Sequence, residues 1–208
     1  AQSIAEQIGD KASIAGTLLN IGLVHSSQGN YAQALELYQK NMPIAEALDD
    51  RSHIARTLNA IALVHWGEAN YAQARDFFLR SLTMSEALGD RKVIASTLMN
   101  IGNVHLRQGN YAPALEFYQK SLAVVESLGD KSRLAHMLGN IGAVHYSQGN
   151  YAQALEFLER SLTMSEAVGE RWAVAAMLGN IAEVQRVQGN YAQALEFFER
   201  SLTLFEAL

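Results

Sequence analysis

Hydrophobic residues recur along this chain at steps of three and four positions, the spacing that places them on one face of an α-helix. Within residues 129–168, one such face is formed by Leu134, Ala135, Leu138, Ile141, Gly142 and His145. A second face follows, formed by Tyr151, Ala154, Leu155, Leu158, Leu162 and Val168. No stretch has the apolar–polar alternation of a half-buried strand. The pattern predicts an all-α protein built from pairs of helices.

Short polar segments separate these helices. In "QGN", Gly149 is expected to end the first helix in a left-handed conformation and Asn150 to cap the second helix. Gln153, three residues later, is placed to complete a capping box. In "GD", Gly129 is the expected stop and Asp130 the expected cap of the next helix.

Three residues depart from this regular pattern of helices and turns. Pro113 falls in the first turn of a helix, where proline is tolerated. Pro43 falls inside a helix, and we expect a kink or an early end near Asn41–Met42. Ala69 replaces the glycine between two helices, so we expect a different turn there.

The helix pairs repeat with a fixed period of 40 residues. The segment "QGNYAQALEF" begins at 148 and again at 188, and close variants begin at 28, 68 and 108. Regular self-similarity of this length is typical of a solenoid, in which each unit buries its apolar face on its neighbours. We predict one solenoid over 1–208, with 1–8 as the end of a truncated helix, followed by the repeats 9–48, 49–88, 89–128, 129–168 and 169–208.

The repeat resembles the tetratricopeptide repeat. The positions that carry the resemblance are Ala135, Ile141–Gly142, His145, Gly149, Tyr151, Ala154, Leu158 and Ser161. Histidine replaces the usual aromatic residue of the first helix, serine replaces the late alanine, and the terminal proline is missing. The 40-residue form is similar to repeats of the spindle-orientation adaptors with GoLoco motifs and of bacterial signalling regulators, and to the slightly longer repeats of kinesin light chains. The resemblance implies a right-handed α-solenoid, a superhelix of antiparallel helix hairpins whose first helices line a concave groove.

Composition excludes several other classes of function. The chain has no cysteine, and we expect a cytoplasmic location. No apolar run is long enough to span a membrane, and the net charge of −5 disfavours nucleic acid as a partner. Successive members of the histidine series His25, His65, His105 and His145 are expected to lie at least one helix-packing distance apart, which is too far for them to share a metal ion. We interpret them as packed side chains with a hydrogen-bonded ring nitrogen. We predict no cofactor, no metal and no enzymatic activity, since no residue that breaks the repeat is a good catalytic candidate.

The candidate binding residues lie on the first helices. Asparagine is a mediocre helix-interior residue, yet it recurs there as Asn20, Asn100, Asn140 and Asn180. The resemblance implies that this position faces the groove, where an amide can both donate to and accept from a peptide backbone. The alternative is a structural hydrogen bond between repeats.

Charge and variation point to the same helices. The ranges 11–29, 51–69, 91–109, 131–149 and 171–189 carry a balance of +8, and the remaining residues carry −13. An acidic partner segment is therefore expected. Among the positions that vary between repeats, we assign acidic recognition to Arg56, Arg107, Arg186 and His136, and apolar anchoring to Trp66 and Tyr146. Unselected surface variation is the alternative.

The leading hypothesis is a non-enzymatic protein–protein interaction scaffold that binds an extended acidic peptide in its concave groove. One alternative is a self-assembling or engineered array without a groove ligand. Another is a sensory domain of a larger signalling protein. The sequence also lacks a polar capping helix, which indicates a fragment of a longer array or an engineered one, and we expect end-to-end homo-oligomers through the apolar ends.

Overall fold

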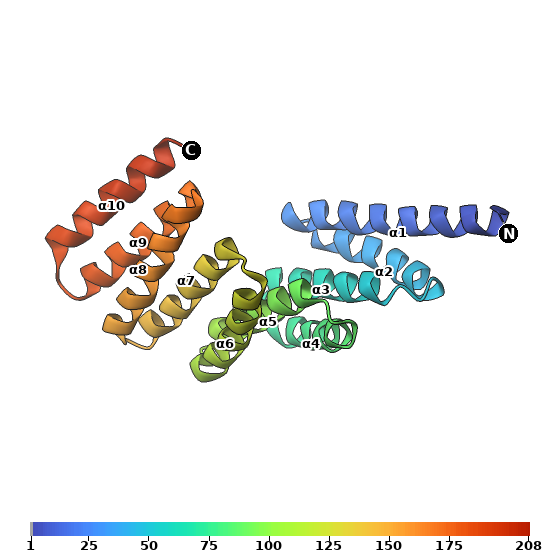
Figure 1. Ribbon diagram of the computed structural model, residues 1–208, viewed down its shortest axis with the longest axis horizontal. Coiled ribbons are helices and arrows are strands. Elements are labelled where there is room, and N and C mark those ends of the chain that lie inside the picture. Colours follow the sequence, from blue (N-terminus) through green and yellow to red (C-terminus); the bar gives the residue numbers. More distant parts are fainter. Residues whose placement is uncertain (1) are drawn as a thin grey trace. The chain divides into compact units, whose positions relative to one another are not determined.

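The chain is a series of helices joined by short turns. The computed structural model describes residues 2–208, and their side chains from residue 9 onward. The helices are α1 (Gln2–Ser27), α2 (Tyr31–Ala47), α3 (Arg51–Gly67), α4 (Tyr71–Leu88), α5 (Arg91–Arg107), α6 (Tyr111–Leu128), α7 (Lys131–Ser147), α8 (Tyr151–Val168), α9 (Arg171–Val187) and α10 (Tyr191–Glu206). The described residues contain no strand (Figure 1). The predicted all-α solenoid class is confirmed.

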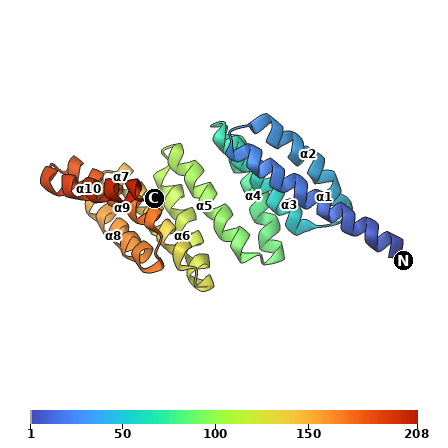
Figure 2. The same ribbon diagram turned by 90° about the horizontal axis from the view of Figure 1, so that it is seen from above.

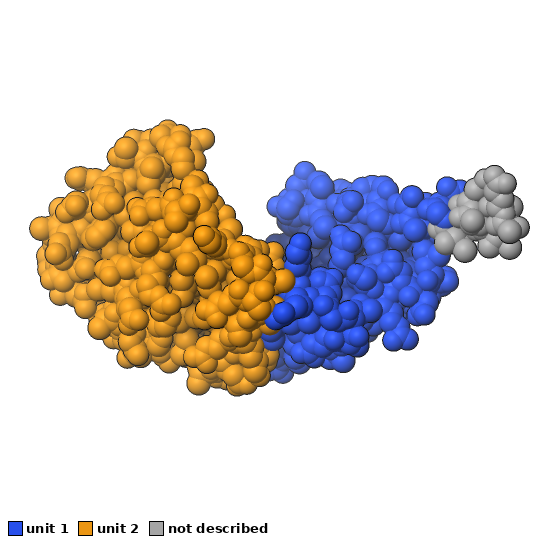
Figure 3. All heavy atoms as spheres, viewed as in Figure 1, with its two compact units in different colours: residues 1–104 blue, residues 105–208 orange. Residues whose placement is uncertain are grey.

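The chain divides into two compact units, residues 1–104 and 105–208 (Figure 3). In the first unit, α1 packs on α2 and α3 packs on α4 as hairpins, with α2 against α3 between them. In the second unit, α7 pairs with α8 and α9 with α10, and α8 lies against α9 (Figure 2). Each unit therefore repeats one packing scheme. The two helices of a hairpin pack on each other, and the second helix also packs on the first helix of the next hairpin.

The glycine turns form as the sequence predicts. Gly149 and Gly129 have φ of 76° and 66°, in the left-handed region that ends a helix. The expected different turn at Ala69 is wrong, because Ala69 adopts φ of 59°. Its N–H donates to the carbonyl of Trp66 at 3.0 Å, and the next N–H donates to the carbonyl of His65 at 2.8 Å. These bonds satisfy the last carbonyls of α3 and hold alanine in the glycine conformation.

The predicted helix caps are half right. The Asp130 carboxylate accepts the Arg133 N–H at 3.0 Å, as expected. The Asn150 side chain makes no capping bond and instead donates to Gln148 Oε1 at 3.3 Å, so this prediction is wrong. The capping box with Gln153 is wrong as well. It needs the Asn150 N–H, which already donates to the carbonyl of His145 at 2.9 Å.

Two expected helix ends do not occur, whereas the expected kink at Pro43 stays a prediction. Helix α2 continues through Pro43 to Ala47, so the early end near Asn41–Met42 is wrong. The buried Asn41 side chain fixes α2 at this point, because its Nδ2 donates to the Ala15 carbonyl at 3.0 Å and its Oδ1 lies 2.9 Å from His53 Nε2. Helix α1 likewise runs through Gly9, at the position where other repeats turn. The repeat boundaries stay a prediction.

The core surrounds the second helices, and its buried clusters join Tyr38 of α2 to residues of α1 and α3, and Leu158 of α8 to Ile181 and Val184 of α9. Its centre is one large side chain of the second helix, Tyr38, Phe78, Tyr118 or Leu158, which is fully buried. A polar contact accompanies it, since the hydroxyls of Ser81, Ser161 and Ser201 donate to first-helix carbonyls at 2.7–2.8 Å. In the first repeat Asn41 takes this place, which links the hairpin to His53 of the next repeat.

The histidine series packs against aromatic rings. His65, His105 and His145 stack on Phe77, Phe117 and Phe157, with centroids 5.4–5.5 Å apart. The packing interpretation is confirmed for these three residues. The expected hydrogen bond to a ring nitrogen is not made by Nδ1 of His25 or His145. This atom is buried in both residues and has no hydrogen-bond partner among the described residues.

Candidate functional site

Each unit carries a small cavity at the junction of two repeats, lined mostly by first-helix residues. In the first unit the cavity measures about 50 Å³ and is lined by Leu63, Trp66, Phe78, Asn100 and Asn103. In the second unit it measures about 70 Å³ and is lined by Ala143, Tyr146, Leu158, Asn180, Glu183 and Val184. Five lining residues of the second cavity stand 80 positions after those of the first. The cavities are therefore a property of the repeat, and their lining varies with the irregular positions.

The asparagine series offers unoccupied hydrogen-bonding groups. Asn20 and Asn180 are exposed, and Asn100 and Asn140 are half-buried. Hydrogen bonds to other protein groups are absent for all four side chains within residues 9–208. The alternative interpretation, a structural bond between repeats, is therefore not seen at this position. The neighbouring Asn59 does make such a bond, since it accepts the Thr97 hydroxyl at 3.4 Å.

Two lining residues of the second cavity, Tyr146 and Glu183, belong to a charged network. The Tyr146 hydroxyl donates to Glu183 Oε1 at 3.1 Å, and Arg186 Nε and Nη2 donate to the same carboxylate at 2.7 Å each. The Arg186 hydrogen bond lowers the pKa of Glu183, whereas burial and the Glu183 contact raise the pKa of Tyr146. Arg186 is therefore already engaged, and an acidic ligand group would compete with Glu183 for it.

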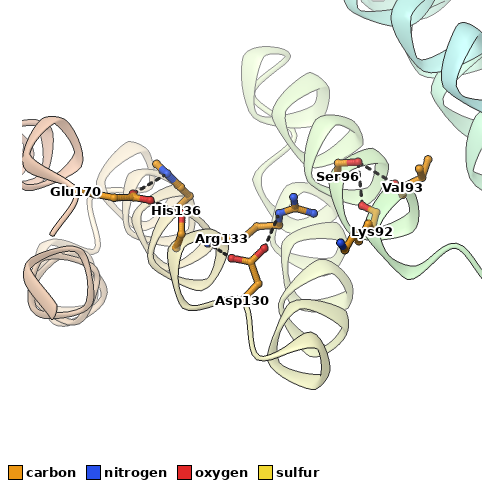
Figure 4. Close-up of polar contacts among 8 residues, drawn as sticks. Lys92, Val93, Ser96, Asp130, Arg133, His136 and Glu170 are labelled. Atoms are coloured by element: carbon orange, nitrogen blue, oxygen red, sulfur yellow. Dashed lines mark hydrogen bonds and ion pairs between the residues drawn. The ribbon is translucent and has the colours of Figure 1, made fainter. Parts of the chain in front are cut away.

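His136 belongs to a separate polar cluster at the start of α7 (Figure 4). Its Nε2 lies 3.3 Å from Glu170 Oε2, and Ser132 donates to the other oxygen of that carboxylate. Glu170 stands where other repeats have a capping aspartate, and it makes no capping bond itself. It joins the start of α9 to α7 instead. In the first unit, Ser96 stands at the position equivalent to His136. Its hydroxyl donates to the carbonyls of Lys92 and Val93 at 3.1 and 3.0 Å (Figure 4).

The structure brings some of the predicted residues together. Trp66 lines a cavity with Asn100, and Tyr146 lines the other with Asn180 and contacts the network that holds Arg186. Six predicted residues line neither cavity, namely Asn20, Asn140, Arg56, Arg107, His136 and Arg186. Glu183 was not among the predicted site residues, although its position varies between repeats and that variation could have identified it.

A second pair of hollows is larger, and each is lined by three successive helices, α6, α7 and α8 in the second unit and α2, α3 and α4 in the first. One, of about 550 Å³, is lined by Glu126, Lys131, Leu134, Leu138, Glu156, Glu159, Arg160, Thr163, Met164 and Ala167. The other, of about 520 Å³, is lined by Met42, Glu46, Arg51, Ile54, Leu58, Arg80, Thr83, Met84, Ala87 and Leu88. Their lining combines apolar side chains with acidic and basic ones. The hollows were not predicted from the sequence, because the lining of each one comes from three helices of two repeats.

Within the described residues, no group of three or more histidine, aspartate or glutamate side chains is placed to hold a metal ion. The helices that the structure describes include none with the length and hydropathy to cross a bilayer.

Several solved structures share this fold at low sequence identity. BtubC from P. vanneervenii matches with a TM-score of 0.80 and 16% identity, over 98% of this chain and 91% of that one. A signal transduction ATPase with a tetratricopeptide repeat sensor, from Pyrococcus horikoshii, matches with a TM-score of 0.79 and 16% identity, over 92% and 30%. The Rap conjugation gene regulator of plasmid pLS20, in complex with the Phr* peptide, matches with a TM-score of 0.77 and 13% identity, over 91% and 53%.

Family models settle the relationship that these folds indicate. No curated protein sequence matches the chain. The tetratricopeptide repeat model matches residues 13–87 and 93–167, and a second tetratricopeptide repeat model matches residues 142–207. The chain belongs to the tetratricopeptide repeat family.

Proposed function

We propose that the chain is a non-enzymatic scaffold that binds an extended, acidic peptide segment along its first helices. The observation that carries the proposal is the pairing of unoccupied asparagine amides with side-chain-sized cavities at equivalent places in both units. A backbone amide of a ligand can use both groups of an asparagine side chain at once. The cavities of about 50 and 70 Å³ suit single small apolar groups rather than a whole small molecule.

The assignment of an acidic ligand rests on charge. The first helices carry most of the basic residues, and Arg56 and Arg107 are exposed on them. Arg186 is held by Glu183, so it contributes when a ligand carboxylate replaces that contact. A relative in the same structural class was solved with a bound peptide, which supports a peptide as the ligand class.

The test is selection from a displayed library of short unstructured peptides, sorted by net charge. Acidic peptides with at least one apolar residue are the expected winners. The selected peptides should then bind Asn100→Ala/Asn180→Ala roughly tenfold more weakly, since two net hydrogen bonds of ~0.5–1.5 kcal/mol each are lost.

The matched control is Gln153→Ala, which removes an exposed amide from a second helix and should leave affinity unchanged. Selection of neutral or basic peptides would contradict the acidic ligand. Unchanged binding by the double asparagine variant would contradict the amide mechanism.

A further inference from the structure

Two helices expose apolar residues along one face. On α10 the exposed residues are Tyr191, Leu195, Phe198, Leu202 and Phe205. On α1 they are Ile14, Ile21 and Val24. We call these sets the α10 face and the α1 face. The residues of the α10 face recur at steps of four and three positions, which places them on one continuous apolar stripe of the helix.

The α1 face repeats residues that are buried elsewhere. Ile21 is 43% exposed, whereas the equivalent Ile181 of α9 is 1% exposed. Val24 is 55% exposed, whereas the equivalent Val184 is 1% exposed. In α9 both residues pack on α8 in one cluster with Ala154 and Leu158. The residue types on α1 are therefore those of a first helix that packs on a preceding second helix.

The α10 face repeats the other half of the same contact. Phe198 is 38% exposed, and the equivalent Leu158 of α8 is 1% exposed. Around Leu158 pack the partly buried Tyr151, Leu155 and Leu162, and identical residues occupy the equivalent positions 191, 195 and 202 of α10. The α8–α9 contact inside the second unit is thus a template for α10 against α1.

We propose that the chain associates head to tail, with the α10 face of one copy packed on the α1 face of a second copy. We choose a second copy of the chain as the partner because the new contact would continue the contact between repeats. The second copy supplies the same isoleucine and valine that cover α8 within one chain. The two faces differ, so the interface is heterologous and one copy can bind two others. The association does not depend on a groove ligand.

The experiment is sedimentation velocity of the 208-residue chain over a dilution series, with two blocking variants. Ile21→Glu places a charge on the α1 face and Leu202→Glu places one on the α10 face; both positions are exposed, so each variant should fold, which circular dichroism checks. Wild-type chain should increase in mass with concentration, and each variant alone should stay monomeric. An equimolar mixture of the variants keeps one intact pair of faces and should form dimers without longer species.

The matched control is Leu79→Glu, a similarly exposed leucine of α4 outside both faces, where the equivalent repeats have Glu159 and Glu199. It should associate like the wild type. A wild-type chain that stays monomeric at all concentrations would overturn the proposal. Association of either single variant, or a mixture that stays monomeric while the wild type associates, would overturn the head-to-tail geometry.

Discussion

Two non-glycine residues adopt the left-handed conformation that glycine adopts at the other turns. Asp49 has φ of 49° and Ala69 has φ of 59°. An L-residue with a Cβ pays roughly 1–2 kcal/mol for this conformation, because Cβ crowds the following carbonyl. The surrounding hydrogen bonds keep the backbone in place, so the cost is retained as lower stability at these two turns.

Replacement of Ala69 by glycine should therefore stabilise the protein. We expect the free energy of unfolding to rise by about 1 kcal/mol, the relief of strain less the greater freedom of glycine in the unfolded chain. The measurement is chemical denaturation of Ala69→Gly. Gly149→Ala is the matched control and should lose a similar amount, since open space surrounds a Cβ at Gly149 and only its φ of 76° opposes the change. Effects of the same sign in both variants would contradict the explanation.

His53 gives the first unit a dependence on pH. Burial lowers its pKa from the ordinary 6.5, the positive charge of Arg56 lowers it further, and Asp50 opposes both. Below pH 6.5 the unfolded state therefore binds more protons than the folded state, and stability falls as pH falls. The free energy of unfolding should be lower at about pH 5.5 than at about pH 7.5.

His53→Gln isolates this contribution, because glutamine can still donate to Asn41 Oδ1 but does not titrate. The wild type should lose more stability than this variant over the same pH interval, in denaturation followed at several pH values. Parallel pH profiles for the two proteins would show that His53 does not contribute.

At the scale of the helix, tertiary contacts override local helix breakers. Helix α2 carries Pro43 in its interior, where α6 has Ala123 and α8 has Thr163. Proline lacks the N–H that would bond to the carbonyl four residues earlier, and its ring crowds that carbonyl. The buried Asn41, bonded on both sides, keeps the helix intact around this defect.

Pro43→Ala should restore the missing helix bond. The expected gain in unfolding free energy is roughly 2 kcal/mol, after allowing for the more flexible unfolded chain. Thermal and chemical unfolding of the variant provide the measurement. Pro113→Ala is the control, since Pro113 lies in the first turn of α6 and its substitution should change stability little. Equal gains in the two variants would mean that the position within the helix does not matter.

Sequence periodicity was sufficient for the helices and insufficient for contacts between them. The apolar spacing around Leu158 and the glycine at 149 predict helices and turns because they act locally. The Asn150 side chain does not cap α8 and donates to Gln148 instead, and the capping box with Gln153 fails because the Asn150 N–H already donates to the His145 carbonyl of the previous helix. The contact of Tyr146 with Glu183 joins two repeats, so spacing within one repeat could not reveal it.

At the scale of the whole molecule, one contact scheme is reused and only selected positions change. Ile181 and Val184 recur as Ile61 and Val64, both buried, and the contact between repeats is thereby preserved along each unit. The lining residues of the first-helix cavities change from Trp66 to Tyr146 and from Asn103 to Glu183. The contact that recurs between repeats supplies stability and a template for association. The positions that differ between repeats give each cavity a different lining.

Association between copies should also make stability depend on concentration. A contact made by the folded chain alone stabilises it by mass action, ~2.7 kcal/mol at a partner concentration 100 times the Kd. For a chain of this length we expect the thermal midpoint to rise by roughly 5 °C between concentrations near the Kd and about 100 times higher. Differential scanning calorimetry of the wild type and Leu79→Glu should show this rise. Ile21→Glu should show a flat midpoint, because its altered α1 face removes the contact without removing any residue of the hairpin core. A midpoint that rises equally in Ile21→Glu would locate the association elsewhere on the molecule.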